Sequence, residues 1–205
     1  MTLNLAILPH GAARRRVAAV AAAAAFAGAA AAQPVEYVLD PEHATVAFLV
    51  DHIGYASVLG QFLEVEGSYR FDESSAELSQ VEITIDVSSV DTNHDERDEH
   101  LRSGDFLDFR EFPQMRFTAD GARRTGERTF VIEGNLELLG KTQPLALEAV
   151  WNKSGEYPFG GEPYVMGVSA RGSLRRSAFG MSYGVDNDLV GDEVTIIVEL
   201  EARRQ

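Results

Sequence analysis

The chain of 205 residues contains no cysteine, which excludes disulfide bonds, thiolate metal sites and catalysis by a thiol. Basic side chains are also scarce, because 18 Lys and Arg stand against 32 Asp and Glu and give a formal net charge of −14. So acidic a protein repels nucleic acid and anionic lipid headgroups at long range, and we expect no nucleic-acid partner. Beyond the N-terminal segment, no apolar run reaches the roughly 20 residues of a transmembrane helix, so we expect no stable membrane insertion.

The first 32 residues have the pattern of a secretory signal peptide. Arg14–Arg16 form a basic flank, a short alanine-rich apolar run follows to Ala29, and Ala30–Ala32 supply small residues at the cleavage position. The run is short for a membrane anchor, which is the alternative, and the paired arginines leave general and twin-arginine export both open. Removing residues 1–32 would change the formal net charge from −14 to −17 and leave residues 33–205, a length typical of one domain.

Most of the remaining chain alternates apolar and polar residues, as half-buried β-strands do. Clear examples run through residues 81–87, 130–138 and 194–200. We predict eight or nine antiparallel strands, with Asp40-Pro41 at the end of the first and a bulge near Leu63 in the third. A meandering sheet of this size tends to close, because closure removes its exposed edges. The predicted fold is therefore all-β, an eight-stranded antiparallel barrel with a short helical insert, and a flattened two-sheet sandwich is the alternative.

Residues 92–113 break the strand pattern, because they carry ten charged side chains around a few aromatic ones. Asn93 is a suitable helix N-cap with Glu96 three residues further on, and Gly104 suits the C-terminal end of a helix. We therefore predict a short helix in this segment. A polar helical insert among strands commonly covers an opening or builds a site.

Several motifs, in matching order and spacing, resemble the YceI-like family of bacterial periplasmic proteins. The resemblance runs through nearly all of the chain beyond residue 32. Any one motif alone would be a weak signal, but together they are specific. The motifs are Tyr37-x-x-Asp40-Pro41-x-His43 followed by Phe48 and His52; Val58, Gly60 and Phe62; Thr92-Asn93, Arg97-Asp98-x-His100-Leu101, Asp105-Phe106 and Phe112-Pro113; and Arg176 before Phe179-Gly180-Met181.

The resemblance implies a lipocalin-like, extended barrel with an elongated apolar tunnel that holds a polyisoprenoid chain, as in isoprenoid quinones or polyprenyl phosphates. It also implies a periplasmic location, and a homodimer is a further expectation because family members can form dimers. The family usually has an acidic residue two positions after Arg176, where this chain has Ala178, so the pairing of Arg176 and the headgroup preference stay open. The predicted function is lipid binding for transport, storage or stress protection, without catalysis and without a cofactor.

An isoprenoid tail requires a dry apolar cavity with few polar anchors. Aromatic and aliphatic residues on the predicted strand faces and in the insert are candidates for its lining, and methionines adapt to a flexible tail. The alternative for each of them is an ordinary packed core. The candidates are Phe48, Phe62, Ile85, Phe106, Phe109, Met115, Phe117, Phe130, Leu136, Trp151, Met166, Phe179 and Met181.

Polar candidates for contact with a headgroup are Arg97 and His100 in the insert and Arg176 near the C-terminus. For each arginine we favour a salt bridge over contact with a headgroup, between Arg97 and Asp98 or Asp105 and between Arg176 and one of the many acids, since a chain this acidic offers many carboxylates. His100 and Asp98 are also suited to tie the insert to the barrel through hydrogen bonds.

Two other classes of function compete with lipid binding. His94 and His100 are six residues apart, which places them on different faces of a helix, and no H-E-x-x-H motif is present, so we expect no metal site. A metal-assisted hydrolase that uses His52, Asp98 and His100 is nevertheless the alternative function. A stress or interaction protein with a solid core is the third.

Overall fold

The computed structural model describes residues 1–2, 33–159, 161 and 163–205. The expected signal peptide therefore lies outside the described residues, apart from its first two. None of the helices in the described part of the chain is long and apolar enough to cross a membrane.

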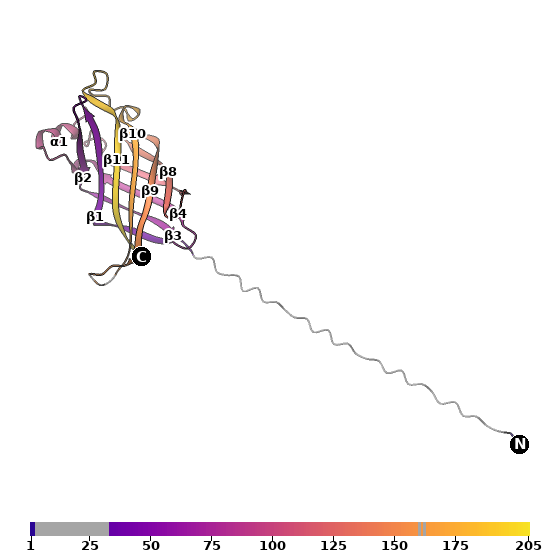
Figure 1. Ribbon diagram of the computed structural model, residues 1–205. Helices are drawn as coiled ribbons and strands as arrows, with labels where there is room; N and C mark the ends of the chain where they lie inside the picture. The colour runs from indigo at the N-terminus through magenta and orange to yellow at the C-terminus, as the bar shows by residue number, and fades with distance from the viewer. Residues whose placement is uncertain (3–32, 160, 162) are drawn as a thin grey trace. The chain divides into compact units, whose positions relative to one another are not determined.

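The described chain folds into strands, one short α-helix and two 3-10 turns (Figure 1). The strands are β1 (Val35–His52), β2 (Ala56–Phe62), β3 (Val65–Asp72), β4 (Glu77–Asp86), β5 (Val90–Asp91), β6 (Gln114–Ala119), β7 (Arg123–Arg124), β8 (Thr129–Leu138), β9 (Lys141–Glu156), β10 (Tyr164–Arg175) and β11 (Val190–Arg204). The helix is α1 (Asp95–Arg102), and the 3-10 turns are η1 (Val87–Ser89) and η2 (Arg176–Phe179).

Eight of these strands close into a barrel, as the sequence predicts. Hydrogen-bonded neighbours run in the order β11-β10-β9-β8-β6-β4-β3-β1, and β1 pairs in turn with β11. The closing ladder is antiparallel and extends from Tyr37 opposite Arg204 to His52 opposite Val190. Closure leaves no exposed edge along this ring, which removes the main route to edge-to-edge association.

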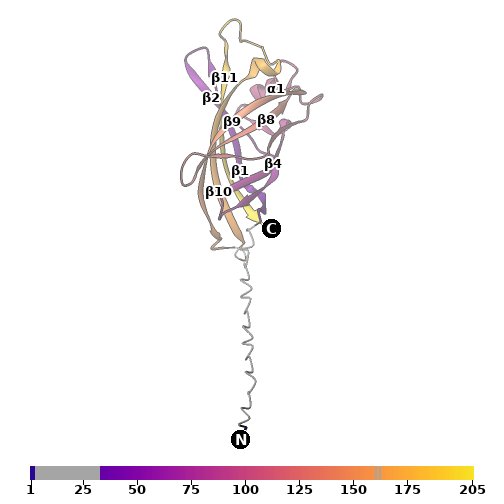
Figure 2. The ribbon, with the colours of Figure 1, turned by 90° about the vertical axis from the view of Figure 1, so that its right-hand side faces the viewer.

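Strand β1 shares one of its edges between two partners. Its first residues pair with β3, and residues 46–52 pair with β2. Strand β2 pairs with the short β5, which leads directly into α1. The helix therefore lies near the end of the barrel where β1 finishes and β11 begins, which we call the helix end (Figure 2). The far end is the opposite one, where β1 begins and β11 finishes.

Two local predictions about the strands are wrong. Strand β1 does not end at Asp40-Pro41, because its pairing with β11 resumes at Ala44 after a register shift. The shift accommodates a proline that has no N–H to donate to the ladder. The parity change near Leu63 is no bulge either, because β2 ends at Phe62 and a separate strand begins at Val65.

Two glycines allow aromatic rings to lie flat against the barrel wall. A Cβ atom at Gly60 on β2 would lie 2.2 Å from Cζ of Phe48, and one at Gly134 on β8 would lie 2.4 Å from Cζ of Phe117. Each ring therefore covers a position where the neighbouring strand has no side chain. This arrangement moves aromatic volume out of the centre of the barrel.

Candidate functional site

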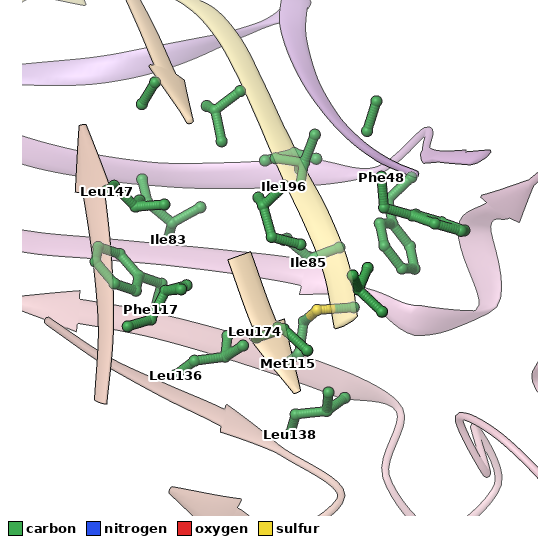
Figure 3. A pocket seen from close by; sticks show the side chains of 18 of the residues that line it. Phe48, Ile83, Ile85, Met115, Phe117, Leu136, Leu138, Leu147, Leu174 and Ile196 are labelled. Carbon is green, nitrogen blue, oxygen red and sulfur yellow. The ribbon is translucent and has the colours of Figure 1, made fainter. Parts of the chain in front are cut away.

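The barrel interior contains an apolar cavity of about 490 Å³. All eight barrel strands contribute lining residues. The side chains drawn in Figure 3 are directed toward this common space, and their atoms are carbon apart from the sulfur of Met115. The cavity is therefore not filled by the chain's own side chains, unlike the solid core of the third alternative. The candidates from the sequence that line it are Phe48, Phe62, Ile85, Phe106, Met115, Phe117, Phe130, Leu136, Trp151, Met166 and Met181, together with Arg97, His100 and Arg176.

Two of the predicted lining residues lie outside the cavity wall. Phe109 packs against the hydrophobic core, with the Arg110 guanidinium 5.9 Å from the centre of its ring. Phe179 is buried in η2 and is also outside the lining. Sequence reasoning missed many wall residues whose signal was the strand alternation itself. Those visible in Figure 3 are Ile83, Leu138, Leu147, Leu174 and Ile196.

The cavity volume sets the size of ligand that fits. A cavity of about 150 Å³ holds one benzene molecule, that is six carbons. By this ratio the volume of about 490 Å³ holds roughly 20 carbons, the size of about four isoprene units.

The opening of the cavity lies at the helix end. Ile53, Tyr183 and Leu189 line the cavity and are at the same time exposed to solvent. The backbone N–H of Ile53 donates to the carbonyl of Leu189, so the β1–β2 hairpin and the loop before β11 form one rim.

Arg176 holds that loop in place. Its side chain is 2% exposed and donates to the backbone carbonyls of Gly191, Met181, Tyr183 and Val190, at distances between 2.7 and 3.1 Å. No salt bridge to Arg176 is present among the described residues, so the expected pairing with an acid is wrong. Burial lowers the pKa of Arg176, although Asp192 opposes the shift.

These carbonyls also explain why Ala178 is compatible with a buried arginine. The Ala178 side chain is exposed, and its carbonyl accepts a hydrogen bond from Gln143. Arg176 therefore obtains its partners from backbone oxygens and does not require a carboxylate two residues on.

Helix α1 is tied to Thr92, the residue that follows β5. Nε of Arg97 donates to the Thr92 hydroxyl and its Nη2 donates to the Thr92 carbonyl, both at 2.7 Å. The buried Asp98 carboxylate accepts from the hydroxyl and the N–H of the same threonine. The prediction that hydrogen bonds of Asp98 and His100 tie the insert to the barrel is wrong, because Asp98 accepts from Thr92 and His100 is bonded to Asp105, both within the insert. Arg97 forms neither of the expected salt bridges, with Asp98 or with Asp105.

The predicted caps of α1 are wrong by one residue at each end. His94 is the N-cap, and its Nδ1 accepts the N–H of Arg97 at 3.3 Å. Asn93 cannot take that place, because its φ of 61° is left-handed and an N-cap residue has an extended backbone. Ser103 is the C-cap in place of Gly104.

His100 belongs to an aromatic cluster at the helix end. Its ring meets the rings of Phe106 and Tyr183 edge-on, with centres 4.9 and 5.0 Å away, and its Nε2 lies 3.0 Å from a carboxylate oxygen of Asp105. The Arg176 guanidinium lies 5.8 Å from the centre of Phe106. The cluster joins the insert to the loop before β11, so the insert forms part of the wall beside the opening.

At the far end, Glu73 holds the β3–β4 turn against the opposite wall. Its carboxylate accepts hydrogen bonds from Tyr37 on β1, Ser154 on β9 and Tyr164 on β10, at 2.7, 2.7 and 3.0 Å. Burial alone would raise the pKa of Glu73, but these hydrogen bonds and the charge of Arg204 hold it below its usual range. The ionised carboxylate thus joins strands on opposite sides of the ring.

The model of the YceI-like domain matches residues 37–202. The chain belongs to the YceI-like family. A UPF0312 protein of Azotobacter vinelandii is 38% identical over 178 residues, which cover 85% of this chain and 90% of the relative. The protein YceI of Salmonella arizonae is 38% identical over 172 residues, with 83% and 87% covered.

Solved structures share the barrel of this YceI-like protein. Burkholderia cenocepacia BcnA superposes with a TM-score of 0.71 at 22% identity, over 80% of this chain and 98% of the other. The YCEI protein of Campylobacter jejuni gives 0.69 at 25% identity, over 76% and 90%. A polyisoprenoid binding domain from Saccharophagus degradans gives 0.63 at 12% identity, over 84% and 99%.

Of the three residues of the alternative hydrolase, His52 and His100 line the cavity and Asp98 does not, and none belongs to a group of side chains close enough to share a metal ion in the described part of the chain. His52 lines the cavity near its opening, Asp98 is bonded to Thr92, and His100 is bonded to Asp105. In the described part of the chain, the one set of side chains close enough to share a metal ion is Asp40, His43 and Glu201, whose ligand atoms lie within 4.8 Å of one another.

Asp40 in that set already has partners. One of its oxygens lies 2.9 Å from Nδ1 of His43 and 2.7 Å from Nη2 of Arg203. Burial alone would raise the pKa of Asp40, but hydrogen bonds from His43, the Glu42 backbone and Arg203 hold it below its usual range. A metal ion would have to displace Arg203, so this set resembles an ion-pair cluster more than a metal centre.

Proposed function

We propose that this YceI-like protein binds one polyisoprenoid chain inside its barrel, as in an isoprenoid quinone or a polyprenyl phosphate. The observation that carries the proposal is the apolar cavity of about 490 Å³ with an opening at one end. A protein of the same fold, the domain from Saccharophagus degradans, is described as polyisoprenoid binding, which supports the assignment. In this proposal the lining candidates contact the tail.

The energetics of burial support such a ligand. Each buried carbon contributes roughly 0.8 kcal/mol, so about 20 carbons contribute about 16 kcal/mol before losses. Association and ordering cost about 4–15 kcal/mol. The difference reaches about 12 kcal/mol at best, which corresponds to a dissociation constant near 1 nM.

The proposed role is that of a carrier or store, with no covalent chemistry and no cofactor. The cavity wall is hydrocarbon along most of its length, and its charged side chains gather at the helix end. A wall of this kind provides affinity for a tail but offers few groups for acid–base or nucleophilic catalysis.

We further propose that the protein works in the periplasm, where it keeps its lipid dissolved for transport, storage or protection under stress. The signal-peptide pattern of residues 1–32 and the strongly acidic composition support this location. Dimer formation remains a prediction, and light scattering coupled to size-exclusion chromatography measures it.

Lipid extraction of protein purified from its native source, followed by mass spectrometry, tests the binding proposal. Ala149 and Val150 on β9 provide a matched pair of variants, since Ala149 is buried and lines the cavity whereas Val150 is exposed. Ala149→Phe should greatly reduce the recovered isoprenoid, and Val150→Phe should leave it unchanged. The absence of isoprenoid from the wild-type protein, together with failure to take up a prenyl quinone, would contradict the proposal.

A further inference from the structure

Two polar groups in the cavity wall have no hydrogen-bond partner among the described residues. They are the hydroxyl of Tyr69 on β3 and the indole N–H of Trp151 on β9. Tyr69 is 6% exposed, and the ring nitrogen of Trp151 is buried. Both flank Phe71, which is two residues from Tyr69 on the same strand and whose ring centre lies 5.4 Å from that of Trp151. The two groups therefore belong to one region of an otherwise apolar cavity.

This region lies toward the far end, away from the opening. Tyr69 is opposite Tyr37, at the start of β1, and the two rings stack with centres 5.4 Å apart. Tyr37 in turn donates to Glu73, which holds the turn against the opposite wall. A ligand that reaches Tyr69 from the helix end must therefore traverse the cavity.

Buried donors without partners are rare in folded proteins, and each one requires a physical explanation. The indole N–H of Trp151 can only donate, and it cannot accept. Burial raises the pKa of Tyr69, so its hydroxyl is a neutral donor at physiological pH. The far end thus offers donors to acceptor atoms of a ligand.

The charged side chains nearby determine which kind of acceptor group of a ligand can bind in this region. Glu73 is ionised and lies in the layer behind Tyr37. No arginine or lysine lines the cavity in this region, because Arg128, which lies 5.1 Å from the centre of the Trp151 ring, and Arg204, which lies 3.9 Å from the centre of the Tyr164 ring, are both outside the lining. A phosphate buried in this region would therefore have no cation in the cavity wall to pair with, whereas a neutral carbonyl oxygen requires only hydrogen-bond donors.

We propose that the far end of the cavity binds a neutral carbonyl group of the ligand, with Tyr69 and Trp151 as its hydrogen-bond donors. The ligand is then an isoprenoid quinone that enters ring first and leaves its tail toward the helix end. This inference rests on the proposed function and narrows it, because it favours quinones over polyprenyl phosphates.

The test compares Tyr69→Phe, which removes one oxygen atom, with the wild-type protein. The ligands are a short-tailed prenyl quinone, an isoprenoid hydrocarbon of matched tail length, and a polyprenyl phosphate of matched tail length. Affinities are measured by displacement of an apolar fluorescent dye, and quenching of Trp151, the single tryptophan of the chain, reports directly on the quinone ring. Infrared spectroscopy measures the stretching frequency of the bound quinone carbonyls.

Tyr69→Phe should weaken quinone binding about tenfold and leave hydrocarbon binding unchanged, because only the quinone loses a hydrogen bond. The carbonyl stretch should shift upward in Tyr69→Phe. Tyr37→Phe is the control, since Tyr37 is outside the cavity lining and its loss should leave that stretch unaltered.

Equal quinone affinity in both proteins with an unshifted carbonyl stretch would overturn the inference, and so would tighter binding of the phosphate than of the quinone. Binding of the hydrocarbon in either case would leave the proposed function intact. Failure of the wild-type protein to bind any of the three ligands would instead refute the proposed function.

Discussion

Replacing Arg176 by methionine should destabilise the barrel more than any surface substitution. The guanidinium is 2% exposed and donates to four backbone carbonyls in and beside the loop that precedes β11. Methionine has a similar length but no donor. The substitution therefore removes all four hydrogen bonds at once, while it preserves most of the buried volume.

The expected loss follows from those carbonyls. Leaving one buried acceptor without a donor costs about 1–3 kcal/mol. The carbonyls near the exposed rim can accept hydrogen bonds from water instead, so the total loss in the free energy of unfolding should be about 3–5 kcal/mol, near the upper limit for single substitutions. For a domain of this size each kcal/mol lowers Tm by about 2–4 °C, which predicts a decrease of about 6–20 °C.

Differential scanning calorimetry of the ligand-free protein measures this decrease. Arg175 provides the control, because it is the adjacent residue, carries the same charge and is exposed. Arg175→Met should change the free energy of unfolding by less than about 0.5 kcal/mol. If Arg176→Met and Arg175→Met unfold at the same temperature, the four carbonyl bonds do not stabilise the fold and the reasoning fails.

Two further predictions concern the far end. Glu73→Gln should lower the free energy of unfolding by about 1–2 kcal/mol at pH 7, because it removes the charge from three hydrogen bonds. The pKa of Glu73 is depressed in the folded state, so its contribution to the free energy of unfolding is present at neutral pH and is lost as the pH falls below about 4. Urea unfolding at pH 7 and pH 3 should therefore show a smaller difference in stability between the wild-type protein and Glu73→Gln at pH 3. An equal difference at both pH values would contradict this. Tyr69→Phe should raise the free energy of unfolding of the ligand-free protein by about 1 kcal/mol, since it deletes a buried donor without a partner; a decrease in the same measurement would show that the hydroxyl has a partner.

The sequence predicted the parts of this fold that depend on local pattern. The period of two along a strand decides which side chains face inward, so Ile85, Phe117 and Leu136 could be assigned to the interior without coordinates. The count of strands and the tendency of a long meander to close then predicted the barrel.

Contacts between distant segments could not be predicted in the same way. Glu73 meets Ser154 and Tyr164 across 81 and 91 residues of sequence, and no local pattern encodes that meeting. The motif around Arg176 indicated an important residue, but only the structure shows that its partners are neutral carbonyls. The lack of a partner for Tyr69 is likewise a property of the assembled barrel.

The Glu73 bridge has a consequence for ligand exchange. Because the Glu73 hydrogen bonds hold the far end of the barrel together, a ligand enters and leaves the cavity through the opening at the helix end. A second ligand therefore cannot displace the first one through the far end. The occupant must back out completely before a replacement threads in. The dissociation rate of the ligand should therefore decrease with each added isoprene unit of the tail, and it should depend little on the concentration of competing ligand.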